Sequence, residues 1–122
     1  MSKEVVVVLG ISDNPDRYSY KAYELLKQYG HRPIGVSPKL VQFHGEKCHR
    51  NLGEVLETVD TLTVYVNPQI SSTMINEIIK LGPKRVIFNP GSENPGIVEA
   101  LKKDSIDVLE ACTLVLLKTH QF

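Results

Sequence analysis

One stretch decides the fold of this chain: Val5-Val6-Val7-Val8-Leu9-Gly10-Ile11-Ser12. An apolar run rich in β-branched residues is typical of a parallel strand that is buried on both faces. The glycine that ends the run indicates a turn in which a ligand can approach the backbone closely. Function is therefore expected just after Gly10.

A helical pattern follows this strand. Ser19 is expected as the helix N-cap and Gly30 as its stop signal. The apolar positions between them have the i, i+3, i+4, i+7 spacing of a core-facing stripe: Ala22, Leu25, Leu26 and Tyr29. Strand, loop and helix in this order direct a helix N-terminus at the strand end, where its free N–H groups favour an anion such as phosphate.

Length and charge narrow the class of protein. The 122 residues suffice for one domain, 1–122, with a core of its own. Fourteen basic and fourteen acidic side chains cancel, which argues against nucleic-acid binding through a basic face. The sequence has no apolar run of about 20 residues and no signal-peptide pattern, so we expect a cytoplasmic protein that does not enter a membrane. Cys48 and Cys112 lack C-x-x-C spacing and are expected as free thiols.

Short apolar runs alternate with helical patterns along the rest of the chain. Further strands are expected at 33–36, 61–66, 85–88 and 106–109, with a short edge strand near 47–49 and a helical turn near 52–56. One helix is expected over 68–81 and another over 95–103 with Asn94 as its N-cap, whereas 113–117 fits a strand or a helix. The order predicts a Rossmann-like three-layer α/β/α fold with a parallel sheet of five or six strands in the order 3-2-1-4-5-6.

The ends of these strands share a residue type. Ligands of such sheets bind beyond the carboxyl ends of the strands, at the point where the strand order reverses. Four ends carry small, polar or proline residues, which favours a shared groove: Gly10-Ile11-Ser12, Ser37-Pro38-Lys39, Asn67-Pro68 and Asn89-Pro90-Gly91.

Nucleotide-binding motifs that the sequence lacks narrow the choice of bound nucleotide. The loop after Gly10 lacks the second and third glycines of the dinucleotide fingerprint, and the second strand ends without an acid for a ribose 2′-hydroxyl, so NAD is disfavoured. Lys39 instead suits an additional ribose phosphate, as in NADP or coenzyme A (CoA). A Walker A loop is also absent from the sequence, which disfavours hydrolysis of a nucleoside triphosphate.

At these residues the chain resembles the small single-domain CoA-binding proteins, whose fold is similar to the N-terminal CoA-binding domain of the succinyl-CoA synthetase alpha subunit. The resemblance covers nearly the whole chain and rests on residues 8–12 with Asn14-Pro15, 17–21, 35–39, 65–68 and 89–91. It implies CoA or an acyl-CoA as the ligand. Ligase chemistry is not expected, because the chain has no counterpart of the synthetase domain that carries the phosphorylated histidine.

The resemblance also implies roles for individual residues. Those implied at the diphosphate are Gly10, Ser12, Ser19 and Tyr20. Those implied at the adenosine and its 3′-phosphate are Ser37, Pro38 and Lys39, where Ser37 stands in place of an asparagine common in the family. Those implied on the other wall are Tyr65, Asn67 and Pro68. The candidate set is completed by Ile11, Arg17, Lys21, Asn89, Pro90 and Gly91.

Little else in the sequence indicates chemistry. The four histidines lack the spacing of a metal site, and no nucleophile–base pair is recognisable in the loops, so we predict neither a metal nor a catalytic residue. Cys112 could face the pantetheine end, although a small buried hydrophobe is the favoured interpretation. Two functions stay open. The favoured one is a non-catalytic module that binds CoA or an acyl-CoA; the other is a small NADP-dependent or acyl-transfer enzyme completed by a partner.

Overall fold

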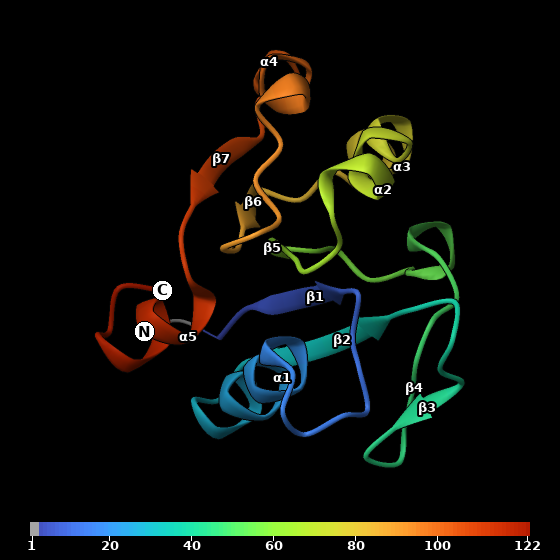
Figure 1. The fold of residues 1–122 in the computed structure, drawn as a ribbon, viewed down its shortest axis with the longest axis vertical. Helices are drawn as coiled ribbons and strands as arrows, with labels where there is room; N and C mark the ends of the chain where they lie inside the picture. The colour runs from blue at the N-terminus through green and yellow to red at the C-terminus, as the bar shows by residue number, and fades with distance from the viewer. Residues whose placement is uncertain (1–2) are drawn as a thin grey trace.

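The computed structural model describes residues 3–122 and shows an α/β fold built on a parallel sheet (Figure 1). Five strands form the sheet in the order β2-β1-β5-β6-β7 within these residues. Their bounds are Val5–Leu9 (β1), Arg32–Val36 (β2), Thr61–Val64 (β5), Arg85–Phe88 (β6) and Asp107–Glu110 (β7). Every pairing is parallel, so the carboxyl ends of the strands meet at one edge of the sheet.

The segment beyond β2 differs from the expected edge strand. The structure has a single parallel bridge there, between Val36 and His49. This bridge lies beside β2, where the predicted order places the third strand. The residues before it form an antiparallel hairpin of β3, Gln42–Phe43, and β4, Glu46–Lys47, which the sequence analysis did not predict. His44 and Gly45 turn the chain between these strands, both with positive φ angles.

Helices cover both faces of the sheet, which confirms the three-layer architecture. In Figure 1, α1 (Tyr18–Gln28) and α5 (Thr113–Lys118) lie on one face. The opposite face is covered by α2 (Pro68–Ser72), α3 (Ile75–Leu81) and α4 (Pro95–Lys103), with the 3-10 turn η1 (Leu52–Glu54) beside α3. The segment 113–117, which fitted a strand or a helix, is therefore helical.

The predicted helix over 68–81 is wrong in one respect, because it is two helices. The break falls at Thr73 and Met74, between α2 and α3. The Thr73 hydroxyl donates a hydrogen bond to the Ile70 carbonyl at 2.7 Å. Short hydroxyl side chains compete in this way for the carbonyls of a helix, and three of them follow one another at 71–73.

The valines of β1 pack in both layers of the core. Val6 and Val8 belong to a cluster with Tyr23 and Leu26 of α1 and Leu117 of α5. Their neighbours Val7 and Leu9 point the other way, into a cluster that includes Ile78 and Leu101. Val6, Val7 and Val8 are 0% exposed, so the strand is buried on both faces as the sequence predicts.

None of the helices in residues 3–122 has the length and apolar character that a bilayer crossing requires.

We expect His31 to make the stability of the fold depend on pH. Its side chain is 4% exposed, and its Nδ1 accepts the Glu4 N–H at 3.0 Å, which requires an unprotonated nitrogen. Burial lowers the pKa of His31, the Glu4 carboxylate opposes this shift, and Arg85 adds to it. The unfolded chain therefore binds the proton first. The contribution of His31 to the free energy of unfolding is complete above about pH 6.5 and is lost as the pH falls toward the folded pKa.

Urea unfolding near neutral pH and at about pH 5 checks this expectation, because the loss is about 1 kcal/mol, the net value of one hydrogen bond. His31→Asn keeps an acceptor and cannot titrate, so it should lose less stability on acidification than the wild type. Equal losses in the two proteins would contradict the role given to His31.

Candidate functional site

Gly10 joins three loops at the carboxyl edge of the sheet. Its N–H donates to the Val36 carbonyl at 2.9 Å, and the Tyr65 N–H donates to the Leu9 carbonyl at 2.9 Å. Gly10 has a φ of +91°, and a methyl group added there would lie 3.0 Å from Val66 Cγ1 and 3.3 Å from the Tyr65 carbonyl. Glycine is therefore required both by the turn and by the close approach of the β5 loop.

The loop after Gly10 leads to an uncapped helix. Ser19 was expected as the N-cap, but Arg17 occupies that position, and the Ser19 hydroxyl accepts the Ser12 N–H at 3.1 Å instead. Ser19 thus holds the β1–α1 loop against the helix. Within residues 3–122 no side chain caps α1, and its first turn contains no acid. The N–H groups and partial positive charge of this helix end are left for an anion.

Ser37 shapes the loop after β2. Its N–H donates to the His49 carbonyl at 2.9 Å, and its hydroxyl accepts the Lys39 N–H at 3.2 Å across Pro38. Serine can therefore close the turn in which the family commonly has asparagine. Lys39 is exposed, and in the described part of the chain no acidic side chain forms an ion pair with it.

The β5 loop carries Asn67 and Tyr65. Asn67 caps α2, because its Oδ1 accepts the Ile70 N–H at 2.9 Å, and Pro68 begins the helix. The Tyr65 hydroxyl faces the hydroxyls of Thr63 and Thr113, but forms no hydrogen bond of ordinary geometry within residues 3–122. Burial is the main cause that raises the pKa of Tyr65 to about 12, so the phenol is neutral at physiological pH.

Asn89 is buried behind the strand ends. Its Nδ2 donates to Thr63 Oγ1 at 2.7 Å and to the Val64 carbonyl at 3.0 Å, and its Oδ1 accepts the Thr113 N–H at 2.9 Å. Every polar atom of this side chain is thus engaged within the protein, joining β5, β6 and α5. The contribution of this loop to a ligand site stays a prediction, and the exposed candidates in it are Pro90 and Gly91.

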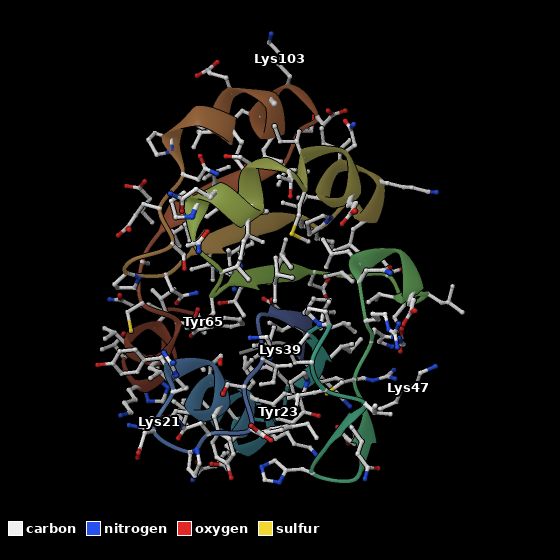
Figure 2. The ribbon with its side chains drawn as sticks, turned by 45° about the vertical axis from the view of Figure 1, so that its right-hand side comes forward. Lys21, Tyr23, Lys39, Lys47, Tyr65 and Lys103 are labelled. Atoms are coloured by element: carbon white, nitrogen blue, oxygen red, sulfur yellow. The ribbon has the colours of Figure 1, made fainter. Side chains whose placement is uncertain are left out.

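The candidates differ in how far they reach solvent. The exposed ones are Arg17, Lys21, Pro38, Lys39, Asn67, Pro90 and Gly91. The half-buried ones are Gly10, Ser12, Tyr20, Tyr65 and Pro68, and the buried ones are Ile11, Ser19, Ser37 and Asn89. Figure 2 shows Lys39 and Tyr65 near the middle of the view, with Lys21 well separated from Lys39 on the outer side of α1. The positive charges of Lys21 and Lys39 are therefore not gathered at one place.

Two supporting residues bind partners on other elements. Asn94 stands at the N-cap position of α4 with Pro95 beginning the helix, as expected, but its side chain makes no capping hydrogen bond; its Nδ2 donates to the Pro68 carbonyl at 3.1 Å and to the hydroxyls of Ser71 and Ser72. It therefore ties α4 to α2. Thr113 is the second, since its N–H and hydroxyl bind Asn89 and Thr63. Their partners are 22 to 50 residues away in the chain, so no local pattern signals these contacts.

The thiols differ from each other. Cys112 is half-buried at the N-cap of α5, so the fully buried position that the sequence favoured is wrong. Cys48 is buried, and its Sγ would lie 3.1 Å from a methyl group added at Gly35. Residues 3–122 contain no cluster of three histidine, cysteine or acidic side chains placed to hold a metal ion.

A cleft of about 420 Å³ lies at the opposite, amino edge of the sheet, with Glu4, Thr61 and Arg85 in its wall. Four of the six charged side chains in its wall form two ion pairs. Arg85 lies 3.4 Å from the Glu4 carboxylate and donates to the Thr61 hydroxyl at 2.8 Å, and Lys84 lies 3.2 Å from Asp60. The ion pairs engage most of the charge of this cleft, whereas the carboxyl edge offers the N-terminus of α1 and a lysine, Lys39, without an ion-pair partner in residues 3–122. We therefore place the candidate site at the carboxyl edge.

Comparison with curated proteins identifies a partial relative. The chain is 24% identical over 123 residues to an acetate–CoA ligase (ADP-forming) of Methanocaldococcus jannaschii. The match covers 94% of this chain and 18% of the ligase, so the chain spans less than a fifth of that relative.

Solved structures share the whole fold. A crystal structure of an uncharacterized protein matches with a TM-score of 0.94 and 39% identity, covering 100% of both chains. A Thermus thermophilus protein matches with a TM-score of 0.89 and 27% identity over 98% of this chain and 91% of that one. An acetyl-coenzyme A synthetase of Ca. Korarchaeum cryptofilum, solved with phosphate and ADP, matches with a TM-score of 0.76 over 88% of this chain and 25% of that one. At 20% identity, this last similarity shows the fold alone.

The family follows from the match of residues 4–118 to the model of a CoA binding domain. Because this match spans nearly every residue, the chain belongs to the CoA-binding domain family.

Proposed function

We propose that this protein binds CoA or an acyl-CoA at the carboxyl edge of its sheet. The observation that carries the proposal is the first turn of α1, which lacks an acid and a side-chain cap and follows the strand end at Gly10. A diphosphate matches this arrangement, because a helix N-terminus offers N–H donors and partial positive charge. Glycine at position 10 removes the side chain that would obstruct the phosphates. Membership of the family supports CoA as the source of that diphosphate.

We assign the remaining groups of CoA to the loops around Gly10 as part of the same proposal. The 3′-phosphate is placed beside Lys39, whose ammonium has no acidic partner in residues 3–122. The pantetheine arm is placed along the β5 loop, beside Tyr65, Asn67 and Pro68. Asn67 and Asn89 use their side chains to cap α2 and to join strands, which favours binding over catalysis as the role of these loops.

CoA is expected to raise the melting temperature of the protein. A ligand bound by the native state at about 100 times its Kd adds roughly 2.7 kcal/mol to the free energy of unfolding. Thermal unfolding across a CoA titration measures the effect, and NADP provides the comparison that distinguishes the alternative enzyme. A larger shift with NADP than with CoA would favour that enzyme, and no shift at about millimolar CoA would remove the proposal.

Lys39 is expected to recognise the 3′-phosphate. Dephospho-CoA on the wild type and CoA on Lys39→Ala should each lose about 1.5–3 kcal/mol of binding free energy, as for a charge-assisted hydrogen bond. The two losses should not add when they are combined, because each removes the same contact. Calorimetry measures all four combinations.

Lys47→Ala is the matched control for this cycle. Lys47 is an exposed lysine of β4, and Figure 2 shows it well apart from Lys39. Its removal should leave the affinity for CoA unchanged. Additive losses in the Lys39 cycle would assign the 3′-phosphate to another cation, and Arg17 or Lys21 at the start of α1 would become the candidate.

A further inference from the structure

The β3–β4 hairpin depends on α1 for its position. Each of its strands has two residues, and so short a hairpin does not hold its own conformation in water. Phe43, 4% exposed, is the residue that docks it. Its ring meets the rings of Tyr20 and Tyr23 edge to face, with centroids 5.0 Å and 4.7 Å away. The hairpin is thus packed on the side of α1 that carries these two tyrosines.

Glu46 fastens the hairpin to α1 through polar contacts. The Tyr23 hydroxyl donates to its Oε2, and the Lys27 ammonium donates to its Oε1 at 3.0 Å. These donors are four residues apart and so share one face of the helix. The hydrogen bond from Tyr23 is the main cause that lowers the pKa of Glu46, so Glu46 is a carboxylate at neutral pH. At the turn, His44 Nε2 also lies 3.5 Å from the Glu24 carboxylate.

The hairpin is also continuous with the loop that carries Lys39. The chain enters the hairpin through this loop and leaves it through Cys48 and His49. The Cys48 N–H donates to the Val41 carbonyl at 2.9 Å, and the His49 carbonyl accepts the Ser37 N–H at 2.9 Å. Lys39 therefore lies inside a closed loop, one end of which is the hairpin. The other side of the proposed site is the N-terminus of α1, the helix to which Glu46 is bound.

We propose that Glu46 is a positioning residue that sets the preference of this protein for CoA over dephospho-CoA. By binding the hairpin to Tyr23 and Lys27 of α1, it fixes the separation between Lys39 and the N-terminus of the helix. A ligand that carries both a diphosphate and a 3′-phosphate needs that separation to be constant. This inference rests on the proposed function, since it assigns the two phosphate groups to those two places.

The test compares the Kd of CoA with that of dephospho-CoA on four proteins: the wild type, Glu46→Ala, Tyr23→Phe and Glu99→Ala. The Kd of CoA should rise about tenfold in Glu46→Ala, because the variant loses a hydrogen-bonded carboxylate. The Kd of dephospho-CoA should change by less than about twofold, because this ligand lacks the 3′-phosphate that Lys39 is proposed to contact. Tyr23→Phe keeps the buried ring and removes the hydroxyl, so it should shift the ratio in the same direction.

Glu99→Ala is the control, because Glu99 is an exposed carboxylate of α4, on the face of the sheet opposite to α1. It should leave the ratio of the two Kd values at the wild-type value. Equal weakening of both ligands in Glu46→Ala, or an unchanged ratio, would overturn the inference.

Hydrogen exchange at the Ser37 amide of the unliganded protein separates this inference from the proposed function. Exchange should accelerate in Glu46→Ala if the hairpin positions the loop, and an unchanged rate would overturn the positioning role on its own. If the wild type binds neither ligand, the proposed function fails, and the assignment of Glu46 to CoA preference fails with it.

Discussion

Replacing Asn89 with alanine is expected to destabilise the fold by about 3–5 kcal/mol, as for a broken buried hydrogen-bond network. The substitution leaves Thr63 Oγ1, the Val64 carbonyl and the Thr113 N–H without the partners that Asn89 gives them. Asn89 is 1% exposed, so water cannot reach these groups without the structure opening. Urea denaturation measures the change in the free energy of unfolding.

Asn76→Ala is the matched control, because Asn76 is exposed on α3. Its removal should change the stability by no more than about 0.5 kcal/mol. A loss below about 1 kcal/mol in Asn89→Ala would mean that the network reforms without its central amide.

Replacing Gly10 is expected to damage both the fold and the binding of CoA. Sheet preferences alone would allow a small residue at this strand end. The structure shows otherwise, because a side chain at φ +91° is strained and its Cβ would press on the Tyr65 carbonyl. Gly10→Val would therefore test folding as much as binding. Gly10→Ala is the better variant, with an expected loss of about 1–3 kcal/mol in stability and a loss of CoA affinity of at least about tenfold.

Gly30→Ala separates the two causes. Gly30 has a φ of +87°, but nothing lies within 4 Å of a methyl group added there. The backbone strain is thus shared by the two variants, and the close contact is present at Gly10. We expect both variants to lose stability, with the larger loss in Gly10→Ala. The affinity for CoA should fall in Gly10→Ala and stay unchanged in Gly30→Ala. Wild-type affinity in a folded Gly10→Ala protein would place the ligand elsewhere.

Periodicity and strand composition were sufficient to predict the layers of this fold. The run of four valines could be a strand of a parallel sheet only if both faces are covered, and the structure buries all but the first of them completely. Local patterns were less informative where side chains bind distant partners. Ser19 and Asn94 have the residue types of helix N-caps, but their polar groups bind the β1–α1 loop and α2.

The hairpin at 42–47 had a signal that could have been used. His44 and Gly45 form a two-residue turn between Gln42–Phe43 and Glu46–Lys47, and glycine at the second turn position is typical of a hairpin. The side-chain contacts of the candidate site, by contrast, had no signal in the sequence. Loop composition at the strand ends predicts which residues share an edge, but the three contacts of Asn89 join residues 24 to 26 positions away and could not be inferred from spacing.

The packing of α5 has a consequence for how the nascent chain folds. Leu117 completes the cluster that covers Val6 and Val8, so β1, which is synthesised before α5, keeps part of its face open until residues 113–118 have been synthesised. An uncharged, β-branched segment such as Val5–Leu9 readily pairs with other exposed strands during that interval. We expect the speed of translation and the binding of chaperones during this interval to affect the fraction of the protein that reaches the native state. This effect is kinetic and is separate from the free energy of unfolding of that state.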